Sequence, residues 1–126
     1  PIEFMVAVIN NQGGFYRTEV YVHEARMAGA QIENPCVNNS EIQTTVYGKV
    51  VYLGFMHLEG LHAKVAADIV ENRTQFGPFQ SLENFIERVP IGIENLQILI
   101  FIGAFRFTKL SKNELLIRAR MILVNF

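Results

Sequence analysis

The residues of this chain with the clearest chemical potential lie in a glycine turn and at the start of the segment after it. Gly60 follows a short apolar run, and Leu61, Val65 and Ile69 recur four residues apart, which predicts a helix after the turn. Glycine lets the backbone turn closely, and the first N–H groups of a helix have no partner within it. Such N–H groups form a small positive concavity that can hold a phosphate. The candidate phosphate contacts are Gly60, Leu61, His62, Ala63 and Lys64.

A second glycine with apolar neighbours, Gly92, follows about thirty residues later, between two further predicted helices. The first runs from its N-cap Ser81 to Arg88, and the second from Glu94 to Ile102. The two turns therefore predict a tandem, degenerate helix-hairpin-helix pair, of which Gly54–Arg73 is the clearer unit. The natural partner of this pattern is a nucleic-acid backbone, contacted without reading bases. The alternative is a purely structural corner, because a glycine between two short helices produces the same signal.

A second candidate for backbone contact is a basic run near the end of the sequence. The net charge of the chain is −1, but between residues 106 and 120 the only acidic residue is Glu114. The basic residues of this run are Arg106, Lys109, Lys112, Arg118 and Arg120. Cations so placed would neutralise phosphates. The alternative is an ordinary solvated helix face.

Several classes of site and setting are disfavoured by composition. Cys36 is the single cysteine and the three histidines are scattered, so we expect neither a disulfide nor a structural metal site. Asp68 is the only aspartate, and we interpret it as a solvated helix residue. We find no signal peptide and no apolar run long enough for a membrane helix, which favours a reducing, cytoplasmic setting. The start at Pro1, without an initiator Met, suggests an excised fragment.

The remaining elements should hold these candidates in place. We predict helices from Pro1 to Asn10 and from about Tyr16 to Ala28. In the second helix, Tyr16, Val20, Glu24 and Met27 are stacked at helical spacing, and Gly29 is its cap. Phe15 and Tyr16 could stack on a base or fill the core. The runs 42–46 and 49–53 predict a β-hairpin that packs on helices, because an isolated hairpin is marginally stable.

The last two helices complete the expected core. Residues 94–102 are apolar on nearly all sides, so we expect them to form the most buried helix, including Phe101. A capping box at Ser111 and Glu114 begins the final helix. Its inward side chains should be Leu115, Leu116, Ala119, Leu123 and Val124. The predicted fold class is mainly α with a small β-hairpin, containing a tandem helix-hairpin-helix DNA-binding domain.

Five short motifs occur in an order that resembles the bacterial DNA polymerase III alpha subunit. They are Pro1–Met5, Arg26–Gly29 with Pro35–Ser40, the hairpin into Leu53–Gly54, Gly77–Phe79 with Glu87–Val89, and Ile102–Phe105. The resemblance implies that residues 1–40 are the end of a fingers region and that residues 41–126 are a β-hairpin plus the tandem helix-hairpin-helix domain. The run from Phe105 to Thr108 resembles one sub-form of the family.

The resemblance implies a role in DNA replication for a non-catalytic fragment of a DNA-directed DNA polymerase, a nucleotidyltransferase. The family's chemistry uses clustered aspartates and Mg²⁺ in a palm domain. This chain has no Asp pair, so we expect no catalytic residue, metal or cofactor in the fragment. The expected function is sequence-independent binding of the duplex DNA backbone, with the sliding clamp and other holoenzyme subunits as partners of the full-length protein.

Two alternatives belong to other functional classes. The first is a protein-interaction or structural module that supports the fingers or contacts the clamp or another holoenzyme subunit. No short clamp-binding peptide of the Gln-x-x-apolar-Phe kind precedes Phe126, which disfavours direct clamp capture by this segment. The second is a DNA-repair glycosylase, which would need a catalytic Asp or Lys after the hairpin. Lys64 lies on the helix itself, and nothing near it resembles a base pocket.

The sequence departs from the family pattern at four positions. Cys36 stands where an Asp is usual, and Glu59 and Phe101 stand where basic residues are common. His62 replaces a second Gly, and we expect it to lack the freedom needed for a left-handed turn. We therefore expect a weak phosphate contact at the first turn and a stronger one along the basic run.

Overall fold

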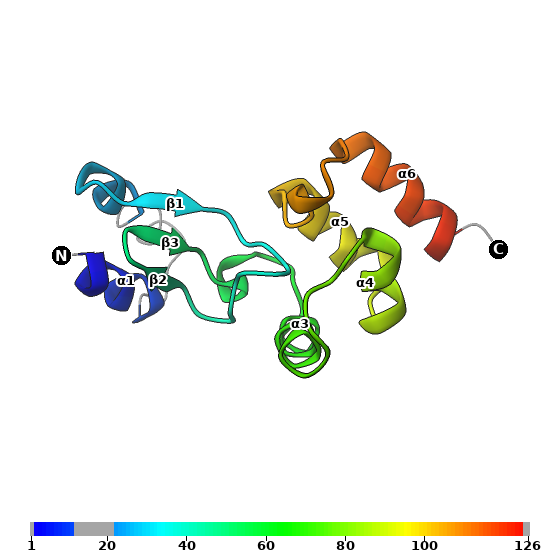
Figure 1. Ribbon diagram of the computed structural model, residues 1–126, viewed down its shortest axis with the longest axis horizontal. Helices are drawn as coiled ribbons and strands as arrows, with labels where there is room; N and C mark the ends of the chain where they lie inside the picture. Colours follow the sequence, from blue (N-terminus) through cyan, green and yellow to red (C-terminus); the bar gives the residue numbers. More distant parts are fainter. Residues whose placement is uncertain (1, 12–21, 125–126) are drawn as a thin grey trace.

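Two hydrophobic clusters organise the chain, one around a small sheet and one among the helices that follow it. The computed structural model describes residues 2–11 and 22–124. Figure 1 shows α1 and the sheet toward the amino-terminal end, helices α4, α5 and α6 toward the other end, and α3, seen end-on, between them. Helices α1 and α6 therefore lie at opposite ends of the molecule.

The amino-terminal helices are held by small and β-branched side chains. Helix α1 (Ile2–Asn11) buries Val6 and Ile9, as its apolar stripe predicts. Residues 22–27 are helical and end at Gly29, which has φ +94° and confirms the predicted cap. Met27, on this helix, is 77% exposed. The other expectations for this region, at Pro1, Phe15 and Tyr16 and for the start of the second helix, lie outside the described residues.

The predicted hairpin is confirmed, and a third strand extends it. Strands β2 (Thr45–Tyr47) and β3 (Val50–Tyr52) are antiparallel and are joined at Gly48, which has φ +63°. Strand β1 (Gln31–Glu33) pairs with β3 in parallel, so the sheet order is β1-β3-β2. Three residues carry too little alternation to reveal a strand in the sequence. The sheet thus uses strands from both sides of residue 40, while the proposed domain boundary remains a prediction.

The elements after the sheet are helical, and two of them begin with a side-chain cap. They are η1 (Phe55–His57), α3 (Ala63–Phe76), α4 (Leu82–Arg88), α5 (Ile93–Ile102), η2 (Arg106–Thr108) and α6 (Lys112–Leu123). Ser81 accepts a hydrogen bond from the Asn84 N–H at 3.0 Å, and Ser111 accepts one from the Glu114 N–H at 3.1 Å. These bonds confirm both predicted N-caps.

The larger cluster is built on buried aromatic rings and on α5. The Phe85 ring lies 4.9 Å from the rings of both Phe79 and Phe105, in edge-to-face geometry. Helix α5 adds three fully buried side chains, Leu96, Leu99 and Ile100. The expectation that Phe101 is buried is wrong, since its side chain is 57% exposed. An all-apolar sequence has no periodicity, so it could not show which face of the helix would meet water.

One inward assignment at the end of α6 also fails. Leu115 and Ala119 are buried and Leu116 and Leu123 are partly buried, as predicted, but Val124 is 58% exposed. Val124 follows the last residue of α6, where the chain leaves the packed face.

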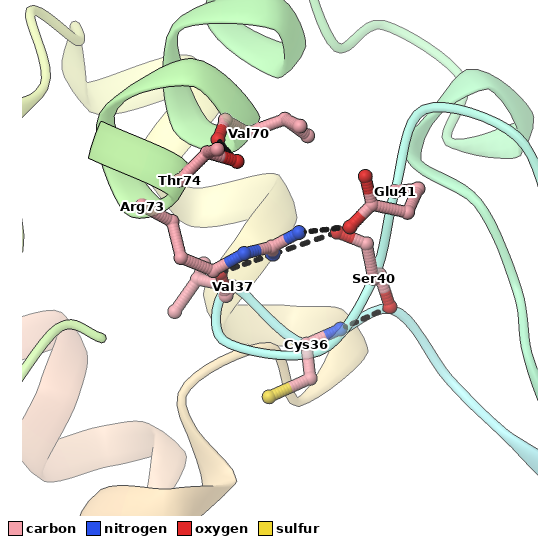
Figure 2. Close-up of polar contacts among 7 residues, drawn as sticks. All are labelled: Cys36, Val37, Ser40, Glu41, Val70, Arg73 and Thr74. Carbon is pink, nitrogen blue, oxygen red and sulfur yellow. Dashed lines mark hydrogen bonds and ion pairs between the residues drawn. The ribbon is translucent and has the colours of Figure 1, made fainter. Parts of the chain in front are cut away.

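A turn at residues 35–41 fastens the sheet region to α3. Arg73 of α3 donates hydrogen bonds to the carbonyl oxygens of Val37 at 2.8 Å and Ser40 at 2.7 Å, and it also pairs with Glu41 (Figure 2). Within the turn, the Cys36 N–H donates to Ser40 Oγ at 2.9 Å, and the Cys36 side chain is buried. Cys36 therefore fills space in this turn.

Candidate nucleic-acid interface

The first turn brings the predicted phosphate contacts to the start of α3. Gly60 has φ +85°, which a residue with a Cβ rarely adopts, and α3 begins three residues later at Ala63. Leu61 lies in the turn, where it packs against the larger cluster. It precedes α3, although its spacing from Val65 and Ile69 predicted a helical position. His62 is the N-cap with φ −67° and ψ 137°. The expectation that His62 needs glycine-like freedom is therefore wrong.

Part of this turn is already occupied by the protein itself. The His62 N–H donates to Asn95 Oδ1 of α5 at 2.8 Å, and Asn95 is buried. Among the described residues, the N–H groups of Ala63, Lys64 and Val65 have no such partner. Sequence reasoning missed Asn95, whose only signal was a polar residue within an otherwise apolar helix. The first turn can therefore offer three amides at the helix start, but not the one at its cap.

The second turn repeats the first with an offset of thirty residues. Helix α3 begins at Ala63 and α5 at Ile93, and Phe55 and Phe85 are both buried on the element before each turn. Because of this offset, Gly60 corresponds to Pro90, and Gly92 corresponds to the N-cap His62. Gly92 has φ −90° and ψ 169°, so the conformation does not require glycine there. The tandem pair is thus present, but its two glycines are not equivalent positions.

A third turn has the same backbone order as the first and was not singled out from the sequence. Lys109 has φ +66°, Leu110 is partly buried against the larger cluster, Ser111 is the N-cap and α6 begins at Lys112. The first turn likewise has a positive-φ residue, a partly buried leucine, a cap and then a helix. Lys109 is the only non-glycine residue with positive φ among those described, so no glycine marked this turn.

Two members of the predicted basic run bind other parts of the protein. Arg106 donates to the carbonyl oxygens of Asn34 at 2.7 Å, Pro35 at 3.2 Å and Gly103 at 2.7 Å, and it lies 3.6 Å from Glu33. The sequence did not show these contacts because its partners at residues 33–35 are some seventy positions away. The guanidinium of Arg106 therefore fastens the sheet region to the end of α5.

The second engaged residue, Arg118, joins α6 to α4. Its guanidinium lies 3.0 Å from Glu114 Oε1 and 3.1 Å from Glu83 Oε1. These hydrogen bonds raise the pKa of Arg118. The pKa of Glu83 is lowered, first by a hydrogen bond from its own backbone N–H and further by Arg118. The charge of Arg118 is thus balanced within the protein.

The other basic residues of the run are available. Lys109, Lys112 and Arg120 are exposed, and within residues 22–124 no acidic side chain pairs with them. Lys64 forms an ion pair with Asp68 at 3.2 Å but has a side chain that is 84% exposed. Two of the available cations, Lys109 and Lys112, flank the third turn, and this makes it the most positive of the three helix starts.

Other kinds of site are not visible in the part of the chain that the structure describes. No group of three or more His, Cys, Asp or Glu side chains there is arranged to hold a metal ion. No helix in the same residues is long and apolar enough to cross a membrane.

Comparison with known proteins gives a consistent set of similarities. The family model described as "Helix-hairpin-helix motif" matches residues 29–115. The chain is 32% identical over 109 residues to the DNA polymerase III subunit alpha of Treponema pallidum (strain Nichols) and 31% identical over 108 residues to that of Thermus aquaticus. It is 34% identical over 119 residues to the error-prone DNA polymerase of Mycobacterium tuberculosis (strain ATCC 25618 / H37Rv).

The similarity covers most of this chain but a small part of each relative. The matches cover 83%, 82% and 92% of the chain, in the order Treponema, Thermus and Mycobacterium. They cover 9%, 9% and 11% of the corresponding relatives, so the chain spans about a tenth of their length. The resemblance seen in the sequence motifs is confirmed.

Proposed function

This chain belongs to the helix-hairpin-helix family, and we propose that it holds the phosphate backbone of duplex DNA as a segment of a bacterial replicative DNA polymerase. The single observation that carries the proposal is the set of three similar helix starts, at α3, α5 and α6. Each leaves backbone N–H groups without a partner among the described residues, and such groups bind phosphate without reading base sequence.

Contacts between the helices hold these starts in place. The hydrogen bond from the His62 N–H to Asn95 joins the first turn to α5. Helix α5 also packs against α6. Amides held in this way need no reordering on binding, which lowers the entropic cost of association.

Charge distinguishes the three contacts. Glu59 is exposed beside the first turn and Glu94 is exposed in the first turn of α5, so both would repel a phosphate. The third turn has Lys109 and Lys112 beside it, and the Glu114 carboxylate in the first turn of α6 is paired with Arg118. We therefore propose that the α6 start is the principal contact, that Arg120 adds to it, and that Gly60, Leu61, His62, Ala63 and Lys64 form a weaker one.

The full-length role is proposed from the same family relationship. In this proposal, the full-length protein is a DNA-directed DNA polymerase of the cytoplasm that carries its catalytic carboxylates and Mg²⁺ outside this segment. The segment helps the enzyme stay on duplex DNA during replication. The sliding clamp and other holoenzyme subunits would be partners of that larger protein.

One observation favours a second candidate function, a protein-interaction module. Ile117, Met121 and Val124 follow one another at helical spacing and are 55%, 62% and 58% exposed. This apolar stripe lies on the opposite side of α6 from the buried Leu115 and Ala119. Such a stripe is a common feature of surfaces that contact another protein.

A salt series of duplex binding by the 126-residue chain separates the two candidates. We expect log K to fall with log salt with a slope of about −0.9 for each neutralised phosphate, for roughly two to four contacts. The combined variant Lys109→Glu, Lys112→Glu and Arg120→Glu should weaken binding to all duplex sequences equally. Arg26→Glu, which reverses one exposed charge outside the three turns, is the control and should have little effect. Lys112→Glu alone is the variant of equal charge change for comparison with it. No detectable duplex binding at low salt would instead support the interaction module.

A further inference from the structure

One face of the small sheet is not covered by the amino-terminal cluster. Val46 and Val51 point toward that cluster, with Val51 fully buried. Side chains alternate along a strand, so Tyr47 and Tyr52 point the other way. Tyr47 is 58% exposed, and its ring lies 6.0 Å from that of Tyr52 at an interplanar angle of 68°. An aromatic pair therefore stands on the open face of the sheet.

This pair forms one wall of a hollow of about 430 Å³. The facing wall contains Asn39, Glu41 and Arg73, which come from the turn at residues 35–41 and from α3. The hydrogen bonds from Arg73 to Val37 and Ser40 hold this wall in place (Figure 2). The hollow is thus preformed between two elements that are distant in sequence.

The chemistry of the hollow suits a neutral planar ligand with an attached anion. Arg73 and Glu41 neutralise each other, so the hollow offers no net charge to a phosphate. The Asn39 amide and the two tyrosine hydroxyls have no hydrogen-bond partner among the described residues and can bind polar edges. Lys49, in the turn directly after Tyr47, is exposed and has no ion-pair partner in the described chain. A base could therefore enter the hollow while Lys49 meets the phosphate next to it.

We propose that this hollow binds an unpaired base of single-stranded DNA, stacked on Tyr47 beside Tyr52 and hydrogen-bonded by Asn39. Aromatic rings with adjacent cations are the usual means of holding single strands without sequence preference, because every base has a stacking face. The site uses no residue of the three turns, so it is independent of the duplex contact proposed above and goes beyond it.

The direct test measures the affinity of the 126-residue chain for a fluorescein-labelled oligothymidylate and for a labelled duplex, by fluorescence anisotropy. We expect Tyr47→Ala to weaken single-strand binding by about tenfold, the loss expected for one base stack, and to change duplex binding by less than about twofold. Tyr47→Phe keeps the stacking face and should keep most of the single-strand affinity. The matched control is Phe76→Ala, because Phe76 is also an exposed aromatic residue, 68% exposed, but lies outside the hollow.

Two outcomes would overturn the proposal. One is that the Tyr47→Ala variant binds the oligothymidylate as tightly as the unmodified chain does. The open face of the sheet would then be interpreted as a contact for a protein partner. The other is that the unmodified chain binds duplex but no single strand, which would leave the proposed backbone contact intact. If the unmodified chain binds the single strand but no duplex, the proposed backbone contact is wrong and the single-strand site remains supported.

A second measurement locates the base directly. An oligothymidylate with one 5-iododeoxyuridine, irradiated in complex with the chain, should form its main crosslink to Tyr47 or Tyr52, identified by mass spectrometry of peptides. A main crosslink to any residue outside the hollow would contradict the proposal. This readout does not depend on any variant remaining folded.

Discussion

The first and third turns have the same backbone order but differ in charge and in the way they are stabilised. The first uses Gly60 at φ +85°, has exposed Glu59 beside it, and gives its cap amide to Asn95. The third uses Lys109 at φ +66°, has Lys112 as its first helical residue, and gives an amide to its own Ser111. The shape of such a turn and its suitability for a phosphate are therefore set by different residues.

The largest expected effect comes from removing the core that both turns share. Phe85→Ala deletes the ring that contacts Phe79 and Phe105, and we expect it to lower the free energy of unfolding by about 3–5 kcal/mol. Urea unfolding followed by circular dichroism measures this loss. Phe101→Ala, on the exposed side of the neighbouring helix, is the control and should cost far less. Equal losses in the two variants would mean that the aromatic cluster does not organise the helices.

An intermediate effect should separate the first turn from the third. Asn95→Ala leaves the His62 N–H without its partner, and we expect a loss of about 1–3 kcal/mol in the free energy of unfolding. Amide hydrogen exchange should become faster at His62, while Lys109 and Leu110, whose N–H groups are bonded within the third turn, keep their protection. Asn113→Ala, at an exposed asparagine on α6, is the control. Uniformly faster exchange in both turns would contradict a local role for Asn95.

The smallest effect concerns the lysine with positive φ. Lys109→Gly removes the strain of a left-handed side chain, and we expect the free energy of unfolding to rise by up to about 1 kcal/mol. The same change removes one cation, so duplex affinity should fall. Thermal unfolding and anisotropy measure the two effects on one sample. Lys112→Ala should lower affinity without the gain in stability, and a loss of stability in Lys109→Gly would show that this turn is not strained.

The parts of the fold that could be predicted are those with local physical causes. The Ser81 and Ser111 caps and the Gly29 helix end depend on a few neighbouring residues, and all three are present. The hairpin was visible because β-branched residues flank Gly48 on both sides. Strand β1 was not visible, because its identity depends on parallel pairing with β3, nearly twenty residues later.

The candidate interface also combines features that the sequence predicted with features that only the structure shows. The sequence located the first turn, its repeat and the basic run, since glycine, apolar spacing and charge are properties of single residues and their neighbours. Asn95 was missed, and the third turn was hidden behind a lysine in a conformation that favours glycine. Tyr52 was seen only as a strand residue and Tyr47 only between the two runs of the hairpin, because the hollow beside them needs α3 as its second wall.

Local sequence patterns predicted the main helices of the described chain, the starts of α4 and α6, and the resemblance to a polymerase segment with tandem turns. Which basic side chains are left without an internal partner depends on the tertiary structure. Arg106 and Arg118 have the same charge as Lys109 and Lys112. The two arginines, however, donate hydrogen bonds to carbonyl oxygens and carboxylates of the protein itself. The physical reason is that a charge is available to a ligand only where the fold brings it no internal partner, and such partners come from distant parts of the chain.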